Sequence, residues 1–268
     1  MRPALFGVPY DAASSFLRGA ADAPARIRAA LHGDATNTWS ELGVDVCGPE
    51  GLVDAGDLAL DDPESPGACR TQVADAVDAL ARRRVVPVIL GGDHAVTEPA
   101  VRGLRRAVAP FSILHIDAHP DLYDEFNGNR WSHACPFARI MEDGLVSRLV
   151  QVGIRTMNRR QREQADRFGV DVIDMSRWAR GDRPAIEEPV YLSIDLDGLD
   201  PAFAPGVSHP EPGGLSVRDV ISLIHGCAGT VIGADIVELN PRQDPHGHTS
   251  RVAAKLVKEL AGTILSGA

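Results

Sequence analysis

The sequence lacks the features of three classes of protein: membrane-spanning, secreted and nucleic-acid-binding. No stretch reaches the roughly 20 apolar residues of a membrane span, and the start, MRPALFGVPYD, has no signal-peptide core. The four cysteines lie far apart without a CxxC pair, which argues against a zinc-thiolate site and a disulfide framework; they are Cys47, Cys69, Cys135 and Cys227. A net charge of −10 disfavours nucleic acids and anionic membranes. We therefore expect a cytoplasmic protein with neither partner.

Short runs rich in β-branched residues alternate with segments of helical periodicity. The runs lie at 5–8, 85–90, 111–116, 149–154, 170–173, 190–194 and 230–237, and the helical segments at 71–83, 96–108, 216–228 and 250–264. This alternation predicts an α/β fold, an open three-layer α/β/α sandwich with a mostly parallel central sheet. Because the chain shows no repeat and no linker, we expect a single domain over residues 1–268.

Two local signals add detail to this fold. Ser216, followed by Asp219 three residues later, resembles a capping box and predicts a helix start. The Asp- and Pro-rich segment 57–67 predicts an exposed loop.

Aspartate and histidine residues cluster directly after three of the apolar runs, in the segments GGDH, DAHPD and DLDGLD. Parallel sheets bind ligands beyond the carboxyl ends of their strands. Since alternate side chains of an extended segment point the same way, each cluster can aim several groups at one point. The six candidate ligands are His94, Asp117, His119, Asp121, Asp195 and Asp197.

The charge of this set predicts bound cations. Four carboxylates cannot gather in a crevice that excludes water unless cations neutralise them, and two divalent ions would balance the charge. Oxygen-rich ligands without a thiolate suit Mn(II) better than structural zinc. Two metals about 3.5 to 4 Å apart can share a water and hold it as hydroxide. A single Asp-x-His or Asp-x-Asp is usually a turn or a helix cap, but three such clusters favour a binuclear metal site.

Several longer strings resemble the ureohydrolase family of arginases and agmatinases: GGDHA, DAHPD, SIDLDGLDP, APGVSHPEPGG and VELNP. The strings SSFLRGAADAPARIR and GNRWSHACPFARIMEDG most resemble plant-type arginases. The resemblance implies an arginase-like fold, two Mn(II) ions per chain, a trimer or hexamer, and hydrolysis of a guanidino substrate to an amine and urea. It favours L-arginine, with L-ornithine as the amine. Agmatine is the first alternative substrate, and guanidinobutyrate or another guanidino acid is the next. A metal-dependent deacetylase and an inactive metal-binding homologue are alternatives of other classes.

The resemblance also implies a role for each site residue. Asp117 and Asp195 would bridge the two ions; His94 with Asp121, and His119 with Asp197, would complete them. Glu238, in VELNP, would pair with the guanidinium, and His133, in WSHACPF, would be the proton shuttle. The residues expected to act in catalysis are therefore Asp121, His133 and Glu238.

Other residues near these motifs are expected to orient a ligand or to form a turn. Asp93 can orient the neighbouring His94, or simply form a turn after the two glycines. His115 is expected to be a core or orienting residue and Asp200 a turn residue. Four histidines have no metal-like companions in the sequence: His209, His225, His246 and His248.

Two departures from the family pattern bear on the substrate. Cys135 stands where plant-type sequences tend to have serine; it can line the pocket and make the enzyme sensitive to thiol reagents. Thr156 stands where animal-type arginases have an aspartate near the substrate amino group, which weakens strict arginine specificity. We expect the loops around 123–137 and 155–165 to set substrate preference.

Overall fold

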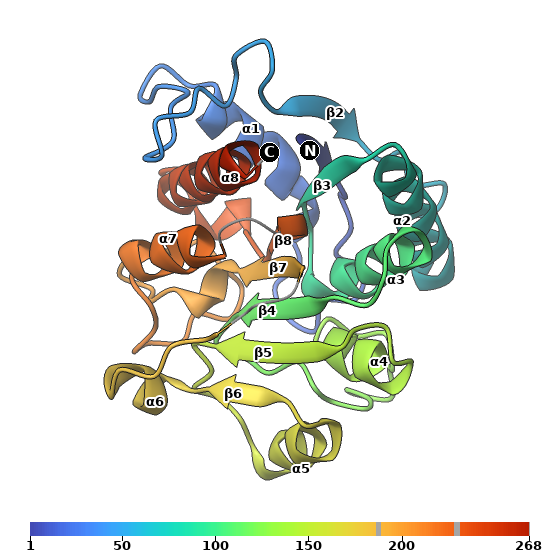
Figure 1. The fold of residues 1–268 in the computed structure, drawn as a ribbon. Coiled ribbons are helices and arrows are strands. Elements are labelled where there is room, and N and C mark those ends of the chain that lie inside the picture. Colours follow the sequence, from blue (N-terminus) through green and yellow to red (C-terminus); the bar gives the residue numbers. More distant parts are fainter. Residues whose placement is uncertain (186–188, 228–230, 268) are drawn as a thin grey trace.

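One eight-stranded sheet runs through the molecule in the order β2-β1-β3-β8-β7-β4-β5-β6 (Figure 1). The computed structural model describes residues 1–185, 189–227 and 231–267. All strand pairings within these ranges are parallel, which confirms the predicted parallel sheet. The strands are β1 (Arg2–Gly7), β2 (Val53–Asp57), β3 (Val85–Leu90), β4 (Ser112–Ile116), β5 (Arg148–Val152), β6 (Asp171–Ile173), β7 (Val190–Asp195) and β8 (Val231–Val237).

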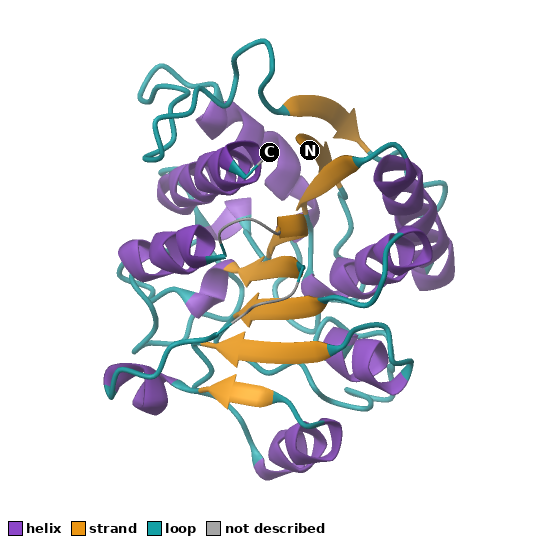
Figure 2. Cartoon of the chain, viewed as in Figure 1, coloured by secondary structure: helices purple, strands orange, loops and turns teal. Residues whose placement is uncertain are grey.

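Helices cover both faces of the sheet, so the predicted three-layer sandwich is confirmed (Figures 1 and 2). On one face α1, α7 and α8 pack together beside α6, and on the other α2, α3, α4 and α5 form a continuous layer. The helices are α1 (Ala23–Leu31), α2 (Pro66–Arg82), α3 (Thr97–Ala107), α4 (Pro136–Glu142), α5 (Arg159–Phe168), α6 (Met175–Ala179), α7 (Val217–Gly226) and α8 (His248–Ser266). Short 3-10 helices are η1 (Ala20–Asp22), η2 (His94–Val96), η3 (Leu196–Gly198) and η4 (Pro241–Gln243).

Each face of the sheet buries its own hydrophobic core. Neighbouring residues of β3 show the division, because Leu90 packs with Leu260 of α8 and Ile89 with Leu104 of α3 in two separate clusters. The central strands are therefore apolar on both sides, which is why they are visible in the sequence as continuous apolar runs.

Several elements were not predicted from the sequence. The edge strand β2 reads VDAGD and is exposed along its whole length, so it has no buried face to leave an apolar pattern. Helix α5 buries only three residues of a highly charged segment, and α4 and α6 have seven and five residues, too few for a clear period. Helix α1 was missed as well.

The predicted boundaries differ from the observed ones by a few residues. Helix α2 begins at Pro66, within the expected loop 57–67, because the Ser65 side chain accepts from the Ala68 N–H and caps it. Strand β5 ends before Gly153, whose φ of 98° leaves the extended region. The capping box of Ser216 and Asp219 is present at the start of α7. Residue 228 of the expected helix 216–228, residue 230 of the expected strand 230–237 and residue 268 of the expected domain lie outside the described residues.

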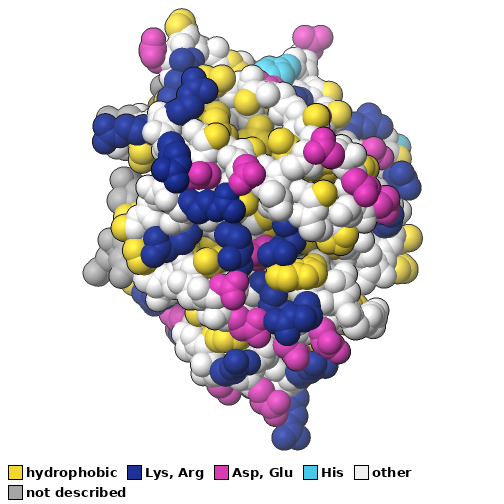
Figure 3. Space-filling view, turned by 90° about the vertical axis from the view of Figure 1, so that its right-hand side faces the viewer, with side chains coloured by type: hydrophobic (Ala, Val, Ile, Leu, Met, Phe, Trp, Pro, Cys, Tyr) yellow, Lys and Arg dark blue, Asp and Glu magenta, His cyan; other side chains and the backbone are white. Residues whose placement is uncertain are grey.

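The surface over α2 to α5 carries basic and acidic side chains intermingled (Figure 3). Ion pairs join Arg106 to Asp75 and Arg70 to Glu98 on this face. Within the described ranges, no helix combines the length and the apolar character that crossing a bilayer requires.

Candidate metal centre and active site

Four neighbouring strands bring the site together at their carboxyl ends. His94 follows β3, Glu238 follows β8, Asp195 ends β7 and Asp117 follows β4, and these strands are adjacent in the order β3-β8-β7-β4. The three predicted clusters therefore meet at one edge of the sheet, as expected from the parallel topology.

Three carboxylates surround one nitrogen of a buried histidine. His94 Nδ1 lies 3.2 Å from Asp117 Oδ2, 3.1 Å from Asp121 Oδ2 and 3.1 Å from Asp195 Oδ2, and it forms no hydrogen bond. The opposite nitrogen, Nε2, contacts Ser193 Oγ at 3.0 Å. Because the Ser193 hydroxyl donates to Asp235 Oδ1 at 2.8 Å, it must accept from Nε2–H. This tautomer leaves a lone pair on Nδ1 that faces the three carboxylates.

A second group lies beside the first and shares Asp117 with it. His119 Nδ1 lies 3.1 Å from Asp197 Oδ2 and 3.4 Å from Asp117 Oδ1. Asp117 thus offers one oxygen to each group. Asp195 faces the first group through Oδ2, while its Oδ1 accepts from the Asp197 N–H at 2.8 Å. All six predicted ligands therefore converge, although only Asp117 contacts both groups directly.

Without cations, protons have to neutralise these groups. Burial opposes protonation of His94 and His119, but the surrounding aspartates outweigh burial and raise the pKa of His94 well above its ordinary value and that of His119 to about 12. Burial, followed by repulsion from Asp197 and Asp117, raises the pKa of Asp195 well above its ordinary value. Burial and the charge of Asp117 raise the pKa of Asp197 to about 7. Once these protons are lost, the imidazole nitrogens and the carboxylate oxygens are a set of electron-pair donors without an acceptor, and divalent cations would supply the acceptor. The residues present therefore fit a two-metal site.

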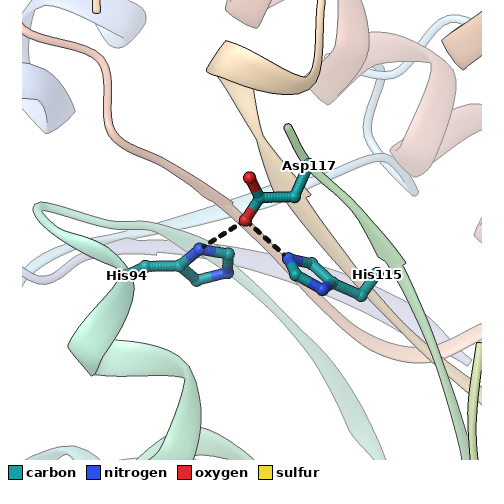
Figure 4. Close-up of side chains that lie close together, drawn as sticks. All are labelled: His94, His115 and Asp117. Carbon is teal, nitrogen blue, oxygen red and sulfur yellow. Dashed lines mark hydrogen bonds and ion pairs between the residues drawn. The ribbon is translucent and has the colours of Figure 1, made fainter. Parts of the chain in front are cut away.

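His115 contacts the same oxygen of Asp117 as His94 does, from the other side (Figure 4). Its Nε2 lies 2.7 Å from Asp117 Oδ2, and Gln151 Nε2 lies 3.0 Å from its Nδ1. Burial lowers the pKa of His115 and keeps it neutral, so that Nε2–H donates to Asp117 and Nδ1 accepts from Gln151. Both nitrogens are occupied, and His115 is an orienting residue, as predicted.

Of the two roles left open for Asp93, the structure shows the structural one, at the turn before His94. Asp93 accepts from the N–H groups of Ala13 and Ala95, at 2.9 and 3.1 Å, and caps η2. Ser193 and Asp235 hold His94 instead. Asp200 is a turn residue as expected, since it accepts backbone N–H groups from both sides of its loop.

Glu238 and His133 form a pair next to the metal-ligand groups. Glu238 Oε1 accepts from the His94 N–H at 2.9 Å and lies 2.8 Å from His133 Nδ1. Burial alone would raise the pKa of Glu238, but the neighbouring His133 and the His94 N–H lower it, so the carboxylate stays ionised. Glu238 has a φ of 65°, a left-handed conformation that is strained for a residue with a side chain and is often found at functional sites.

Ser15 contacts the other nitrogen of His133 with two atoms. Its N–H donates to Nε2 at 3.1 Å, and its Oγ lies 2.8 Å from the same atom. When the His133 ring is neutral, its Nε2 accepts a hydrogen bond from the Ser15 N–H. When the ring is protonated, its Nε2–H can donate to Ser15 Oγ. Burial opposes the protonated form, but Glu238 outweighs burial and raises the pKa of His133 to about 9. Ser15 was not singled out from the sequence.

A cavity of about 210 Å³ opens onto these groups. Away from the carboxylates its wall is formed by residues from the N-terminal segment, the loops after β4 and β5, α5 and the loop before α7: Ser15, Tyr123, Phe126, Thr156, Gln161 and His209. The expected specificity loops therefore contribute to the wall.

His209 lies at this site, although the sequence gave it no companions. Its ring centre is 5.2 Å from that of His133 and 6.0 Å from that of His119. The string APGVSHPEPGG, which carries part of the family resemblance, was the available signal. Burial and the neighbouring His133 lower the pKa of His209, which favours the neutral ring.

The prediction that Cys135 lines the pocket is wrong. Its side chain is fully buried, Sγ donates to the Asn129 carbonyl at 3.7 Å, and the neighbouring Ala134 lines the cavity instead. Burial raises the pKa of the Cys135 thiol to about 12, which makes the reactive thiolate rare.

Comparisons with known proteins agree with this geometry. The sequence matches the Arginase family over residues 2–262. "Arginase 1, mitochondrial" of Arabidopsis thaliana is 46% identical over 275 residues, which cover 97% of this chain and 80% of the relative. "N(1)-aminopropylagmatine ureohydrolase" of Thermus thermophilus is 38% identical over 271 residues, covering 97% and 89%. The solved structure of arginase from Medicago truncatula matches with a TM-score of 0.92 and 41% identity, covering 97% of this chain and 86% of that one.

The fold and the relatives define the class as a metal-dependent hydrolase that acts on guanidino C–N bonds. The chain belongs to the arginase family of ureohydrolases. The deacetylase and inactive-homologue alternatives are therefore set aside.

The expectation of a cytoplasmic protein is wrong. Several of the plant arginases that the chain resembles are named mitochondrial or chloroplastic/mitochondrial, which does not agree with a cytosolic location. Net charge and the lack of apolar runs bear on membranes and secretion, and they do not distinguish the cytosol from an organelle interior.

Proposed function

We propose that this ureohydrolase converts L-arginine to L-ornithine and urea, using two Mn(II) ions. The observation that carries the proposal is the position of Glu238, whose carboxylate faces the same cavity as the two metal-ligand groups. A guanidinium that pairs with this carboxylate would have its carbon beside the metals.

The donor set favours Mn(II). One ion would be held by the group around His94 and the other by the group around His119, with Asp117 and Asp195 shared. The donors are mostly carboxylate oxygens with one imidazole for each ion, which suits a hard or borderline cation. When bound, two such ions would supply an acidified water as the nucleophile at neutral pH.

Glu238 would bind and orient the guanidinium. Its Oε1 is held by the His94 N–H and by His133, whereas Oε2 accepts no hydrogen bond from the described residues. An ionised carboxylate fixed on one side and free on the other can pair with a planar cation in a single orientation.

His133 would deliver a proton to the leaving amine. Its Nδ1 contacts Glu238, the same carboxylate that holds the substrate, so the imidazole lies within reach of the guanidinium nitrogens. Ser15 can hold Nε2 before and after protonation, which keeps the ring in one place while its charge changes.

The cavity wall favours arginine over agmatine. Away from Glu238 and the metal ligands, the described lining residues carry no acidic side chain, and Ser15, Thr156 and Gln161 offer neutral hydrogen-bonding groups. In arginine the α-ammonium and the α-carboxylate balance each other's charge, so neutral groups can bind both, whereas the ammonium of agmatine would lack an anionic partner. Agmatine or a derivative is the second candidate, because the Thermus thermophilus relative is named for an agmatine derivative.

The test is urea release from L-arginine, agmatine and 4-guanidinobutyrate side by side, with Mn(II)-loaded protein and a chelated control. We expect chelator-sensitive urea mainly from L-arginine. A preference for agmatine would overturn the substrate proposal while leaving the class intact.

Glu238→Gln tests the binding role of the carboxylate. The variant keeps the size of the side chain but loses its charge, so kcat/KM should fall by roughly 100-fold or more, since charge-assisted pairing is worth several kcal/mol. Bound metal, measured by elemental analysis, should stay at the wild-type level. Wild-type kinetics in this variant would place the guanidinium elsewhere.

A further inference from the structure

A second, larger cavity lies between α1 and α8. It measures about 420 Å³ and is lined by the second half of α1, the loop 32–36 and the first half of α8. Four cationic side chains line it: Arg26, Arg251, Lys255 and Lys258. None of them belongs to the catalytic site, and the proposed reaction does not use them.

Three of these cations form no ion pair with an acidic side chain among the described residues. Lys258 is 5% exposed, and its Nζ donates only to neutral groups, Thr36 Oγ1 at 2.6 Å and the Asn37 carbonyl at 2.9 Å. Arg251 donates to the His246 carbonyl at 3.0 Å, and Arg26 forms no ion pair or side-chain hydrogen bond. A buried ammonium without a counter-charge is costly, so an anion at this position would be favourable.

The acidic residues nearby do not supply that counter-charge. Asp244 accepts from the N–H groups of Thr249 and Ser250 and from the Ser250 hydroxyl, so its charge is directed at the first turn of α8. Asp34 is exposed at the rim. Only Lys255 is neutralised, by Glu41 and Glu259. The surplus of cations is notable in a chain with 37 acidic and 27 basic residues.

We propose that this cavity binds a small oxyanion with two or more negative charges, a phosphate or a dicarboxylate. Arg26 of α1 and Arg251 of α8 would contact the anion from the two helices. The ammonium of Lys258 would add a third positive charge next to it. Phosphate and carboxylate groups share the acceptor geometry that arginine pairs recognise.

Calorimetric titration of the metal-loaded protein tests the proposal, with inorganic phosphate and succinate as separate probes. Arg26 and Arg251 are exposed, so the double variant Arg26→Ala/Arg251→Ala should fold. We expect its affinity for the bound anion to fall at least about tenfold, because two charge-assisted contacts are lost. The response of each probe tells whether phosphate or carboxylate is preferred.

The matched control is Arg159→Ala/Arg180→Ala, which removes two charges from exposed arginines on α5 and next to α6. It should bind the anion like the wild type. Equal affinity in both double variants would mean that phosphate binds only at the catalytic metals, and would overturn the proposal. The proposal also fails if neither probe binds. It fails as well if Arg26→Ala/Arg251→Ala changes the sedimentation of the protein but not its anion affinity, because the cavity would then be a contact between copies of the chain.

Discussion

Ser193 and Asp235 determine which nitrogen of His94 faces the carboxylates. Removing the hydroxyl in Ser193→Ala would free the ring to turn and to change tautomer, and loss of such a partner typically weakens metal binding by about 10- to 100-fold. Activity measured against free Mn(II) should therefore need more metal for half-saturation and recover at high metal. Ser222→Ala, at an exposed serine of α7, is the control. An unchanged metal dependence would show that Ser193 does not hold the ligand.

Burial should make the enzyme insensitive to thiol reagents. Cys69, Cys135 and Cys227 are buried with pKa values raised to about 12, 12 and 11, whereas Cys47 is exposed. A chromogenic disulfide reagent should titrate one thiol in the native protein and four after denaturation, with activity retained. Rapid inactivation that is abolished in Cys135→Ser would contradict the burial of this side chain.

The ligands could be predicted from the sequence because each lies within a few residues of a strand end, where the direction of the chain fixes the direction of the side chain. Ser193, Asp235 and Ser15 could not. They reach the site through contacts between strands or loops that are distant in the sequence, and a serine inside an apolar strand carries no local sign of its partner. His209 is an intermediate case: its motif could be recognised in the sequence, but its contacts with His119 and His133 could not be predicted.

Helix α8 is tied to the loop after α1 by a group of charges that should depend on pH. Arg218 and then Lys255 lower the pKa of Glu41 to about 2 from its ordinary value of 4.5. Because the pKa of Glu41 is lower in the folded protein than in the unfolded one, its ion pairs with Arg218 and Lys255 stabilise the fold above about pH 4.5. This stabilisation is lost as the pH falls towards 2.

Glu41→Gln should therefore lower the melting temperature at pH 6 and reduce its dependence on pH between about 4.5 and 2. The difference in melting temperature should be smaller at high salt, since the Arg218–Glu41 ion pair is partly exposed. Glu50→Gln, at an exposed glutamate without an ion pair among the described residues, is the control. Identical melting curves for the two variants across this pH range would show that the ion pairs of Glu41 do not stabilise the fold.

Among the secondary-structure elements, the strands that are buried on both faces were the ones that could be predicted from the sequence. Strands β3, β4, β7 and β8 are apolar on both sides and form recognisable runs, and α8 buries a long apolar stripe. Edge and surface elements such as β2 and α5 face water, so their sequences carry mostly charge and turn residues.

At the scale of the molecule, the order of the strands could not be predicted. Strands β8 and β7 lie between β3 and β4, and this insertion brings Glu238 next to His94, 144 residues earlier in the chain. Alternation of strands and helices fixes the class of fold, whereas the sheet order depends on how all the faces pack. The expected trimer or hexamer stays a prediction, which light scattering would test.

The most direct test of the central claim is a titration of metal-free protein with Mn(II), followed by urea release from L-arginine. The two ligand groups around Asp117 predict that activity rises with added metal and levels off at about two ions per chain. Full activity without metal, or a plateau at one ion per chain, would contradict a mechanism that uses both groups.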